Sequence, residues 1–310
     1  MHYRSWLLVP GNNGAELGES IASTADVIVV DLAGIANTAD IDDARANAIQ
    51  WLSAHRRQIV ESKPVGRWVR INPPGSRQWR DDLHAVMPSA PDGLILPRSA
   101  GPEDVRQLAA EVYELEQRHN ISAGATRIIP VVGESPEAAL TIGSYMDAPH
   151  QRLAGLAWDS AMLARTIGAR RLRLGRTARW SDTFARVRTH ALMVANACGI
   201  LAIDAPHDGV SDEKIWRTAH REARADGFAG GFVRDASRVG VVNEAFAVSD
   251  AEMELARAIV AAFANEPDAG NVEVDRRMIS RPQLKRARRM LGLDEISSHA
   301  PIRQPILRPA

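Results

Sequence analysis

Short apolar runs recur along the chain and are separated by stretches with helical periodicity. Most of the runs lack the polar alternation of a half-exposed strand, as expected for parallel strands that are buried on both faces. We predict eight strands, at Trp6–Val9, Val27–Val30, Trp68–Ile71, Gly93–Leu96, Ile128–Val132, Leu153–Ala157, Ile200–Ile203 and Gly230–Val233.

The intervening stretches carry apolar residues at helical spacing and recognisable helix starts. One starts at Gly101-Pro102-Glu103-Asp104, where the proline suits the first helical position and the acids suit the first turn. Another starts at Ser135-Pro136-Glu137, and Ser249 with Glu252 forms a capping-box pattern. Further helices are predicted at Ala15–Ser23, Asp43–His55, Asp182–Ala197, Asp212–Ala225 and Met253–Phe263.

Strands that alternate with helices over about 260 residues predict a (β/α)₈ TIM barrel. The rival fold is a doubly wound open sheet, which usually has a glycine-rich first turn. Here that turn reads Val9-Pro10-Gly11-Asn12-Asn13-Gly14, which does not fit the G-x-G-x-x-G pattern. We predict a barrel over residues 1–265 and a C-terminal helical extension over 266–310, which we expect to pack on a neighbouring subunit.

Composition narrows the possible partners and chemistry. The 38 basic and 38 acidic residues balance, so we expect neither nucleic acid nor a membrane surface as a partner. The single cysteine, Cys198, predicts a cytoplasmic protein without an internal disulfide, and no leader or membrane span is expected. Lysine occurs only at Lys63, Lys214 and Lys285, none at a strand end, which disfavours a Schiff-base aldolase.

Acids and arginines stand where the predicted strands end. In a TIM barrel the carboxyl ends of the strands carry the active site. The loop residue His207 is interpreted as solvated. The strand-end residues include Pro10, Gly11, Asp31, Arg70, Arg98, Glu134, Asp159, Asp204, Asp208, Arg234 and Asp235.

Two of these acids, Glu134 and Asp159, follow neighbouring strands and are predicted to hold Mg²⁺, which prefers one or two carboxylates with waters and ligand oxygens. Arg70 on the same rim is predicted to grip a substrate carboxylate. A metal and an arginine clamp suit a small α-keto or hydroxy acid, whose carbonyl the metal polarises. The structural alternatives are a helix cap for the acids, loop hydrogen bonds for Asp31 and a purely structural ion pair for Arg70.

The order and spacing of several motifs resemble the citrate lyase beta-subunit-like branch of the HpcH/HpaI aldolase superfamily. Glu134-Ser135-Pro136-Glu137-Ala138 is similar to its metal-binding glutamate motif, and Asp159 with Ile167-Gly168-Ala169-Arg170 to its aspartate segment. The resemblance spans roughly residues 4–291. Further matching segments are Arg4–Gly11, Val29–Leu32, Val69–Asn72, Leu94–Pro97, Ile203-Asp204, Gly227–Gly230 and Val242–Phe246.

The resemblance implies a Mg²⁺-dependent lyase that acts on carbon–carbon bonds of citryl-, malyl- or citramalyl-CoA-like thioesters and releases a keto acid. It implies Glu134 and Asp159 as metal ligands and Arg70 as the carboxylate anchor. From their places at strand ends we also predict that Asp31 takes part in catalysis or supports a catalytic residue, and that substrate contacts Asp159 and the Pro10-Gly11 turn. A homotrimer or hexamer is implied, in which the C-terminal segment reaches a neighbour's site.

Several positions depart from the family pattern. A binding or regulatory member without turnover, or an aldolase acting on a free keto acid, are therefore the alternatives. Trp158 is expected to pack away from the pocket, since neighbouring strand residues alternate faces. Alternatively, it fills the space that an acid and its waters would occupy. The departures are Ala33 and Gly34 for Glu-Asp, Arg98 for lysine, Trp158 for glutamate, Arg234-Asp235-Ala236 for Ile-His-Pro, Arg238 for glutamine and Ser280 for aspartate.

Overall fold

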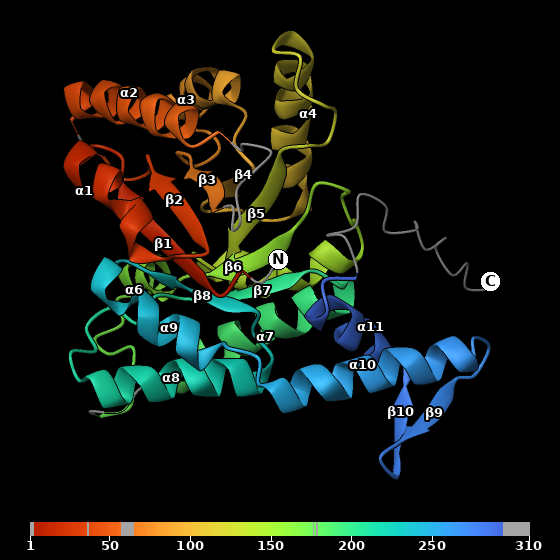
Figure 1. Cartoon of the computed structure of the whole chain (residues 1–310). Coiled ribbons are helices and arrows are strands. Elements are labelled where there is room, and N and C mark those ends of the chain that lie inside the picture. Colours follow the sequence, from red (N-terminus) through yellow and green to blue (C-terminus); the bar gives the residue numbers. More distant parts are fainter. Residues whose placement is uncertain (1–2, 36, 57–64, 176, 178, 294–310) are drawn as a thin grey trace, which may run out of the picture. The chain divides into compact units, whose positions relative to one another are not determined.

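The computed structural model describes residues 3–35, 37–56, 65–175, 177 and 179–293 (Figure 1). Their contacts divide them into two compact units. One comprises Tyr3–Ala247, and the other begins at Val248.

The first unit is a closed barrel of eight parallel strands in sequential order, which confirms the predicted (β/α)₈ fold. Each observed strand agrees with its predicted range to within two residues at either end. The strands are β1 (Ser5–Pro10), β2 (Val27–Asp31), β3 (Gly66–Arg70), β4 (Gly93–Leu96), β5 (Arg127–Val132), β6 (Gly155–Trp158), β7 (Leu201–Asp204) and β8 (Gly230–Val233).

Helices follow the strands and form the outer layer of the barrel. Three of them, α3, α6 and α9, were not predicted. The helices α3 and α9 start without a side-chain cap, and Asp159, which caps α6, was predicted as a metal ligand. The helices of this unit are α1 (Gly14–Glu19), α2 (Thr38–Ala54), α3 (Gln78–Val86), α4 (Pro102–Arg118), α5 (Pro136–Leu140), α6 (Ser160–Thr166), α7 (Asp182–Cys198), α8 (Glu213–Asp226) and α9 (Val239–Ala245), with 3₁₀ turns at Ser20–Ser23, Met87–Ser89, Ile142–Met146 and Ala236–Arg238.

Strand alternation separates two apolar cores. Side chains such as Trp6, Trp68 and Phe232 fill the barrel interior, where their rings meet edge to face at centroid distances of 5.1 and 6.5 Å. The neighbouring residues of each strand, such as Leu7 and Val69, pack in the larger layer between strands and helices. Each strand therefore has a defined inner and outer set of positions, which decides where the residues at its end point.

The second unit is built from helix α10 (Asp250–Asn265), the hairpin β9 (Asn271–Val274) and β10 (Arg277–Ser280), and helix α11 (Arg281–Met290). It has an apolar core of its own, centred on Phe263 and Val272. The hairpin was not predicted, because neither of its strands is the continuous apolar run by which the barrel strands were identified. The contacts group α10 with this unit, whereas the predicted boundary at residue 265 assigned it to the barrel.

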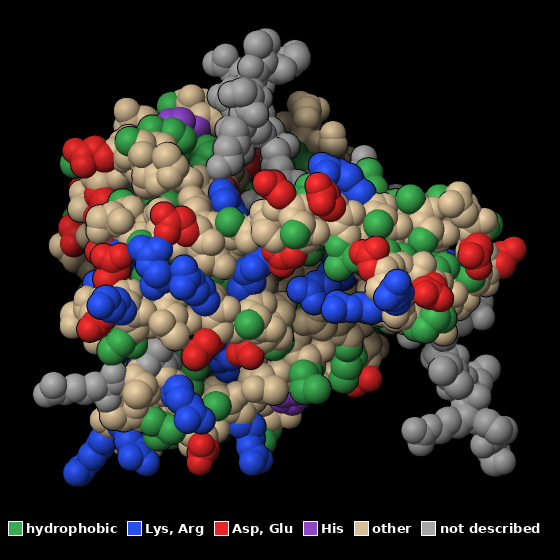
Figure 2. All heavy atoms as spheres, turned by 60° about the horizontal axis from the view of Figure 1, so that its bottom comes forward, with side chains coloured by type: hydrophobic (Ala, Val, Ile, Leu, Met, Phe, Trp, Pro, Cys, Tyr) green, Lys and Arg blue, Asp and Glu red, His purple; other side chains and the backbone are tan. Residues whose placement is uncertain are grey.

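Acidic and basic side chains are interspersed over the molecular face shown in Figure 2, as the balanced composition leads one to expect. Within the described residues, no helix combines the length and apolarity that a membrane crossing needs.

Candidate active site at the mouth of the barrel

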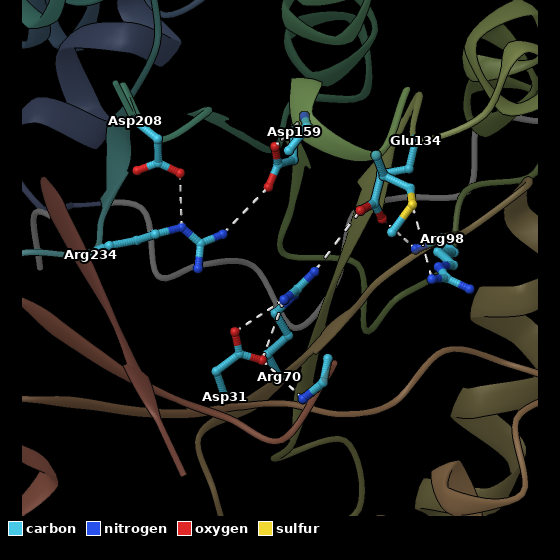
Figure 3. Close-up of polar contacts among 10 residues, drawn as sticks. Asp31, Arg70, Arg98, Glu134, Asp159, Asp208 and Arg234 are labelled. Carbon is cyan, nitrogen blue, oxygen red and sulfur yellow. Dashed lines mark hydrogen bonds and ion pairs between the residues drawn. The ribbon is translucent and has the colours of Figure 1, made fainter. Parts of the chain in front are cut away.

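Four charged residues reach the mouth because they continue the inward-facing series of their strands. A residue two positions beyond an inward-facing one points to the same side. In each of the four strands an inward-facing residue stands two positions before the mouth residue. The pairs are Val29 and Asp31, Trp68 and Arg70, Ala157 and Asp159, and Phe232 and Arg234. The predicted site residues Asp31, Arg70 and Asp159 therefore converge, as Figure 3 shows.

Glu134 reaches the same mouth by a different route. Simple alternation beyond Val132 would be interrupted at Gly133, which adopts φ +74°. Only glycine is readily tolerated there, since a Cβ atom would lie 2.5 Å from the Val187 Cγ1 atom of α7. The bend turns Glu134 toward the barrel mouth, where its Oε2 accepts a hydrogen bond from the backbone N–H of Arg98 (Figure 3). Arg98 is itself held in the left-handed region at φ +53°.

Arg70 lies between two acids. Its Nη1 donates to Asp31 Oδ2 at 3.0 Å, and its Nη2 approaches Glu134 Oε1 at 3.9 Å. Burial by itself would lower the pKa of the guanidinium, but the neighbouring carboxylates, Asp31 foremost, outweigh burial and raise it. Asp31 is held in place as well, because its Oδ1 accepts the Ala33 N–H at 3.0 Å. Asp31 thus orients Arg70 across the mouth.

A second acid–arginine–acid arrangement lies beside the first. Arg234 donates from Nε to Asp208 Oδ2 at 3.0 Å, and its Nη2 lies 3.6 Å from Asp159 Oδ2. The other oxygen of Asp159 caps helix α6 by accepting the Ala161 N–H at 2.9 Å. The sequence shows Arg234 at a strand end, but it does not show that Asp208 and Asp159 are its partners.

The two predicted metal ligands each present one oxygen without a hydrogen bond from any described residue: Glu134 Oε1 and Asp159 Oδ2. Burial raises the pKa of the Glu134 carboxyl, although the Arg70 charge and the Arg98 amide oppose that shift. No group of three or more His, Cys, Asp or Glu side chains within the described part of the chain is arranged to hold a metal alone. Two carboxylate oxygens suit Mg²⁺, which takes its remaining ligands from water and substrate.

Two hollows flank the charged residues at the mouth. One, of about 380 Å³, is lined by Pro10, Asp31, Ala33 and Gly34 among others. Ala33 and Gly34 have small side chains and leave the mouth open on the β1–β2 side. Gly11, predicted to bind substrate, is buried; its N–H donates to the Asp31 carbonyl oxygen at 2.9 Å, which gives it a structural role.

Trp158 does not fill the mouth. It lies on the outer set of β6, fully buried, and its Nε1 donates to Asp204 Oδ1 at 2.7 Å. Asp204 follows the inward-facing Ile203 and therefore points outward as well, where Arg188 of α7 pairs with it at 3.1 Å. The prediction that Asp204 stands on the acidic rim is therefore wrong. Of the two roles considered for Trp158, packing is confirmed and filling of the pocket is wrong. Both side chains belong to a buried polar cluster behind β7.

His207 belongs to this buried cluster and is not a solvated loop histidine. It is 4% exposed, and its Nδ1 lies 2.9 Å from Arg173 Nη2. Its ring packs against His220 with centroids 4.7 Å apart. Burial lowers the pKa of His207, although Asp204 opposes the shift. His207 thus helps to hold the β7–α8 loop.

Two further departures from the family pattern have local structural roles. Asp235 caps the 3₁₀ turn Ala236–Arg238, accepting the Ser237 N–H at 2.9 Å. Ser280 forms a capping box at the start of α11, with its N–H donating to Gln283 Oε1 at 2.8 Å. Both residues are engaged in helix starts, which agrees with their replacing residues of a different function.

The buried histidine His220 makes folding sensitive to acid. Among the described residues, neither of its ring nitrogens has a hydrogen-bond partner, and burial lowers its pKa to about 3. The unfolded chain therefore binds a proton that the folded protein excludes, so stability falls as the pH drops from about 6.5 toward 3. We expect His220→Leu to reduce the loss of unfolding free energy between about pH 7.5 and about pH 4.5 by on the order of 2 kcal/mol. Urea titrations at the two pH values measure the difference; equal losses in both proteins would contradict it.

The fold and the site define the class to which the protein belongs. It is a (β/α)₈ barrel whose mouth presents two carboxylates from neighbouring strands beside an acid-bound arginine. The family model described as HpcH/HpaI aldolase/citrate lyase matches residues 4–236, and the chain belongs to this family. The membership predicted from the motifs is thereby confirmed.

Relatives match over almost their whole length. The chain is 27% identical to the citrate lyase subunit beta of Haemophilus influenzae over 290 residues, covering 93% of this chain and 95% of the relative. It is 26% identical to a (3S)-malyl-CoA thioesterase of Cereibacter sphaeroides over 301 residues, covering 94% and 95%. The crystal structure of CitE from Mycobacterium tuberculosis in complex with magnesium, acetoacetate and coenzyme A has a TM-score of 0.66 and 26% identity, covering 93% of this chain and 97% of that one.

Proposed function

We propose that this protein is a Mg²⁺-dependent carbon–carbon lyase that cleaves a hydroxyacyl thioester of the citryl-, malyl- or citramalyl-CoA kind and releases a keto acid. The observation that carries the proposal is the pair of carboxylate oxygens, Glu134 Oε1 and Asp159 Oδ2, beside the Arg70 guanidinium; neither accepts a hydrogen bond from a residue that the structure describes. The relatives named for citrate lyase and malyl-CoA chemistry support the acyl thioester as substrate class. The CitE complex supports the combination of magnesium, a keto acid and coenzyme A.

In this proposal, Arg70 binds the carboxylate of the keto-acid half of the substrate. Its pKa is raised, so it stays fully charged at every physiological pH, and Asp31 holds it in orientation at 3.0 Å. Glu134 and Asp159 hold the cation, which when bound polarises the keto-acid oxygens and stabilises negative charge. The Arg98 N–H keeps the Glu134 carboxylate turned to the mouth, as an outer hydrogen bond does at metal sites.

Turnover assays with citryl-, malyl- and citramalyl-CoA test the lyase directly and distinguish it from a thioesterase. A lyase forms a keto acid and a shorter acyl-CoA without releasing a thiol, whereas a thioesterase releases free coenzyme A. We expect Mg²⁺-dependent keto-acid formation, and in Arg70→Gln a fall in kcat/KM of about a hundredfold or more, since a charged bidentate contact is lost. Thiol release that equals product formation would overturn the lyase assignment.

A second candidate is a binding protein of the same family that holds a keto acid or acyl-CoA without turnover. It is favoured by Ser280, whose hydroxyl is committed to the helix cap of α11 where the family pattern has an aspartate. Mg²⁺-dependent keto-acid binding by calorimetry, without product from any thioester in the panel, would support this candidate. Product formed by the wild type would eliminate it.

A further inference from the structure

The two arginines at the mouth stand in matching arrangements. Each guanidinium makes one short ion pair with an anchoring acid, Asp31 for Arg70 and Asp208 for Arg234, both at 3.0 Å. Each also approaches a candidate metal ligand at longer range, 3.9 Å to Glu134 Oε1 and 3.6 Å to Asp159 Oδ2 respectively. Figure 3 shows the two guanidinium groups directed toward this pair of carboxylates from different sides.

Arg234 has unused donors that face open space. Its Nε is bonded to Asp208, whereas its Nη1 and Nη2 donate no hydrogen bond to any residue in the described ranges. The side chain is 41% exposed and lines a hollow of about 340 Å³, together with His207, Asp208 and Arg238. This hollow lies beside the ends of β7 and β8, whereas the hollow next to Asp31 lies beside the ends of β1 and β2.

We propose that Arg234 is a specificity-determining residue that binds a second carboxylate of the ligand, while Arg70 binds the first. This inference rests on the proposed function and narrows its substrate class to keto acids that carry a further anionic group. The chemistry follows from the donors, since a guanidinium whose two terminal amino groups donate no hydrogen bond within the described residues matches a carboxylate.

A purely structural role explains the geometry less completely. A brace between the β7–α8 loop and β6 would need short contacts at both ends, but the Asp159 contact of 3.6 Å is outside hydrogen-bond range. Exposed ion pairs of this kind contribute little to stability. The ion pair with Asp208 does not compete with ligand binding, because it uses Nε of Arg234 and leaves the edge formed by Nη1 and Nη2 for a ligand.

Calorimetry on the full chain with Mg²⁺ and two matched ligands tests the proposal. Oxaloacetate and 2-oxobutyrate differ only in a terminal carboxylate against a methyl group. We expect the wild type to bind fresh oxaloacetate at least about tenfold more tightly, because a charge-assisted contact is added. In Arg234→Gln the preference should fall to within about twofold, and Arg234→Lys should retain part of it. The matched control Arg80→Gln, which removes an arginine paired with Glu111 between α3 and α4, should keep the full preference.

The possible outcomes distinguish a failure of the proposed role of Arg234 from a failure of the proposed function. A wild-type preference that survives in Arg234→Gln, or tight 2-oxobutyrate binding without any preference, overturns the role of Arg234 and leaves the proposed function standing. Failure of both ligands to bind wild type with Mg²⁺ overturns both. A merely structural arginine would change the melting temperature of Arg234→Gln and leave the ratio of the two affinities as in wild type.

Discussion

Glu134→Gln is expected to abolish Mg²⁺ binding and to lower kcat/KM by on the order of a thousandfold. The substitution keeps the size of the side chain and one oxygen to accept the Arg98 N–H, but it places an amide NH₂ group toward the mouth and removes the charge that attracts the cation. The several kcal/mol of charge stabilisation that a bound metal supplies correspond to about that factor in rate. Because burial already raises the pKa of Glu134, a neutral amide in its place is not expected to destabilise the metal-free protein.

The matched control is Glu137→Gln, three residues further along the same segment and exposed on α5. It removes the same charge without touching the mouth, so metal affinity and turnover should stay at the wild-type level. Calorimetry with Mg²⁺ and a coupled keto-acid assay measure both quantities. Wild-type metal affinity in Glu134→Gln would refute the two-carboxylate site, and equal losses in the two variants would show that the effect is not local.

The barrel could be predicted from the sequence because its strands are buried on both faces. Runs such as Val27–Val30 have no polar alternation, and their spacing with intervening helices admits few other folds. The hairpin after Asn271 was not identified because neither of its strands, Asn271–Val274 and Arg277–Ser280, is a continuous apolar run. The helices α6 and α9 were also missed, because α9 starts without a side-chain cap and Asp159, which caps α6, was predicted as a metal ligand. Elements that have neither a continuous apolar run nor a recognisable cap are therefore not identified by these patterns.

The site was predictable as a set of strand ends, but not in its orientations. Asp31, Arg70 and Asp159 lie on the inner series of their strands, so reading the strand ends placed them correctly. The same reading failed for Asp204, which is one residue out of phase with the mouth. Counting from the inward-facing Ile203 would have identified its direction.

Glu134 and Arg234 show two limits of the strand-end approach. Glu134 is also out of phase with its strand, and only the positive φ of Gly133 turns it inward, which alternation alone does not reveal. Arg234 is in phase and was visible in the sequence. Its partners were not visible there, because Asp159 and Asp208 follow other strands and meet Arg234 only in the folded barrel.

The buried cluster behind β7 is expected to dominate stability, and Arg188→Met is expected to lower the free energy of unfolding by about 3–5 kcal/mol. Asp204 is fully buried, and Arg188 supplies its charged partner through Nε and Nη2 at 3.1 Å. Burial alone would raise the pKa of Asp204, but His207 and Arg188 outweigh it and hold the pKa well below the ordinary range. Methionine fills similar volume but removes the ion pair, so the buried Asp204 carboxylate keeps the hydrogen bonds from Trp158 Nε1 and the Ala205 N–H without the Arg188 charge.

The control Arg80→Met removes an arginine whose ion pair with Glu111 is exposed on both sides, at 52% and 31% of the side-chain surface. Such pairs are screened by solvent, so its unfolding curve should superimpose on that of the wild type. Guanidinium titrations at neutral pH measure both variants. Since Arg188 lies outside the mouth, Mg²⁺ affinity measured well below the melting temperature should be retained in Arg188→Met. Loss of stability together with intact metal binding would separate the two charged clusters, whereas an unfolding midpoint equal to that of Arg80→Met would mean that Asp204 does not depend on Arg188.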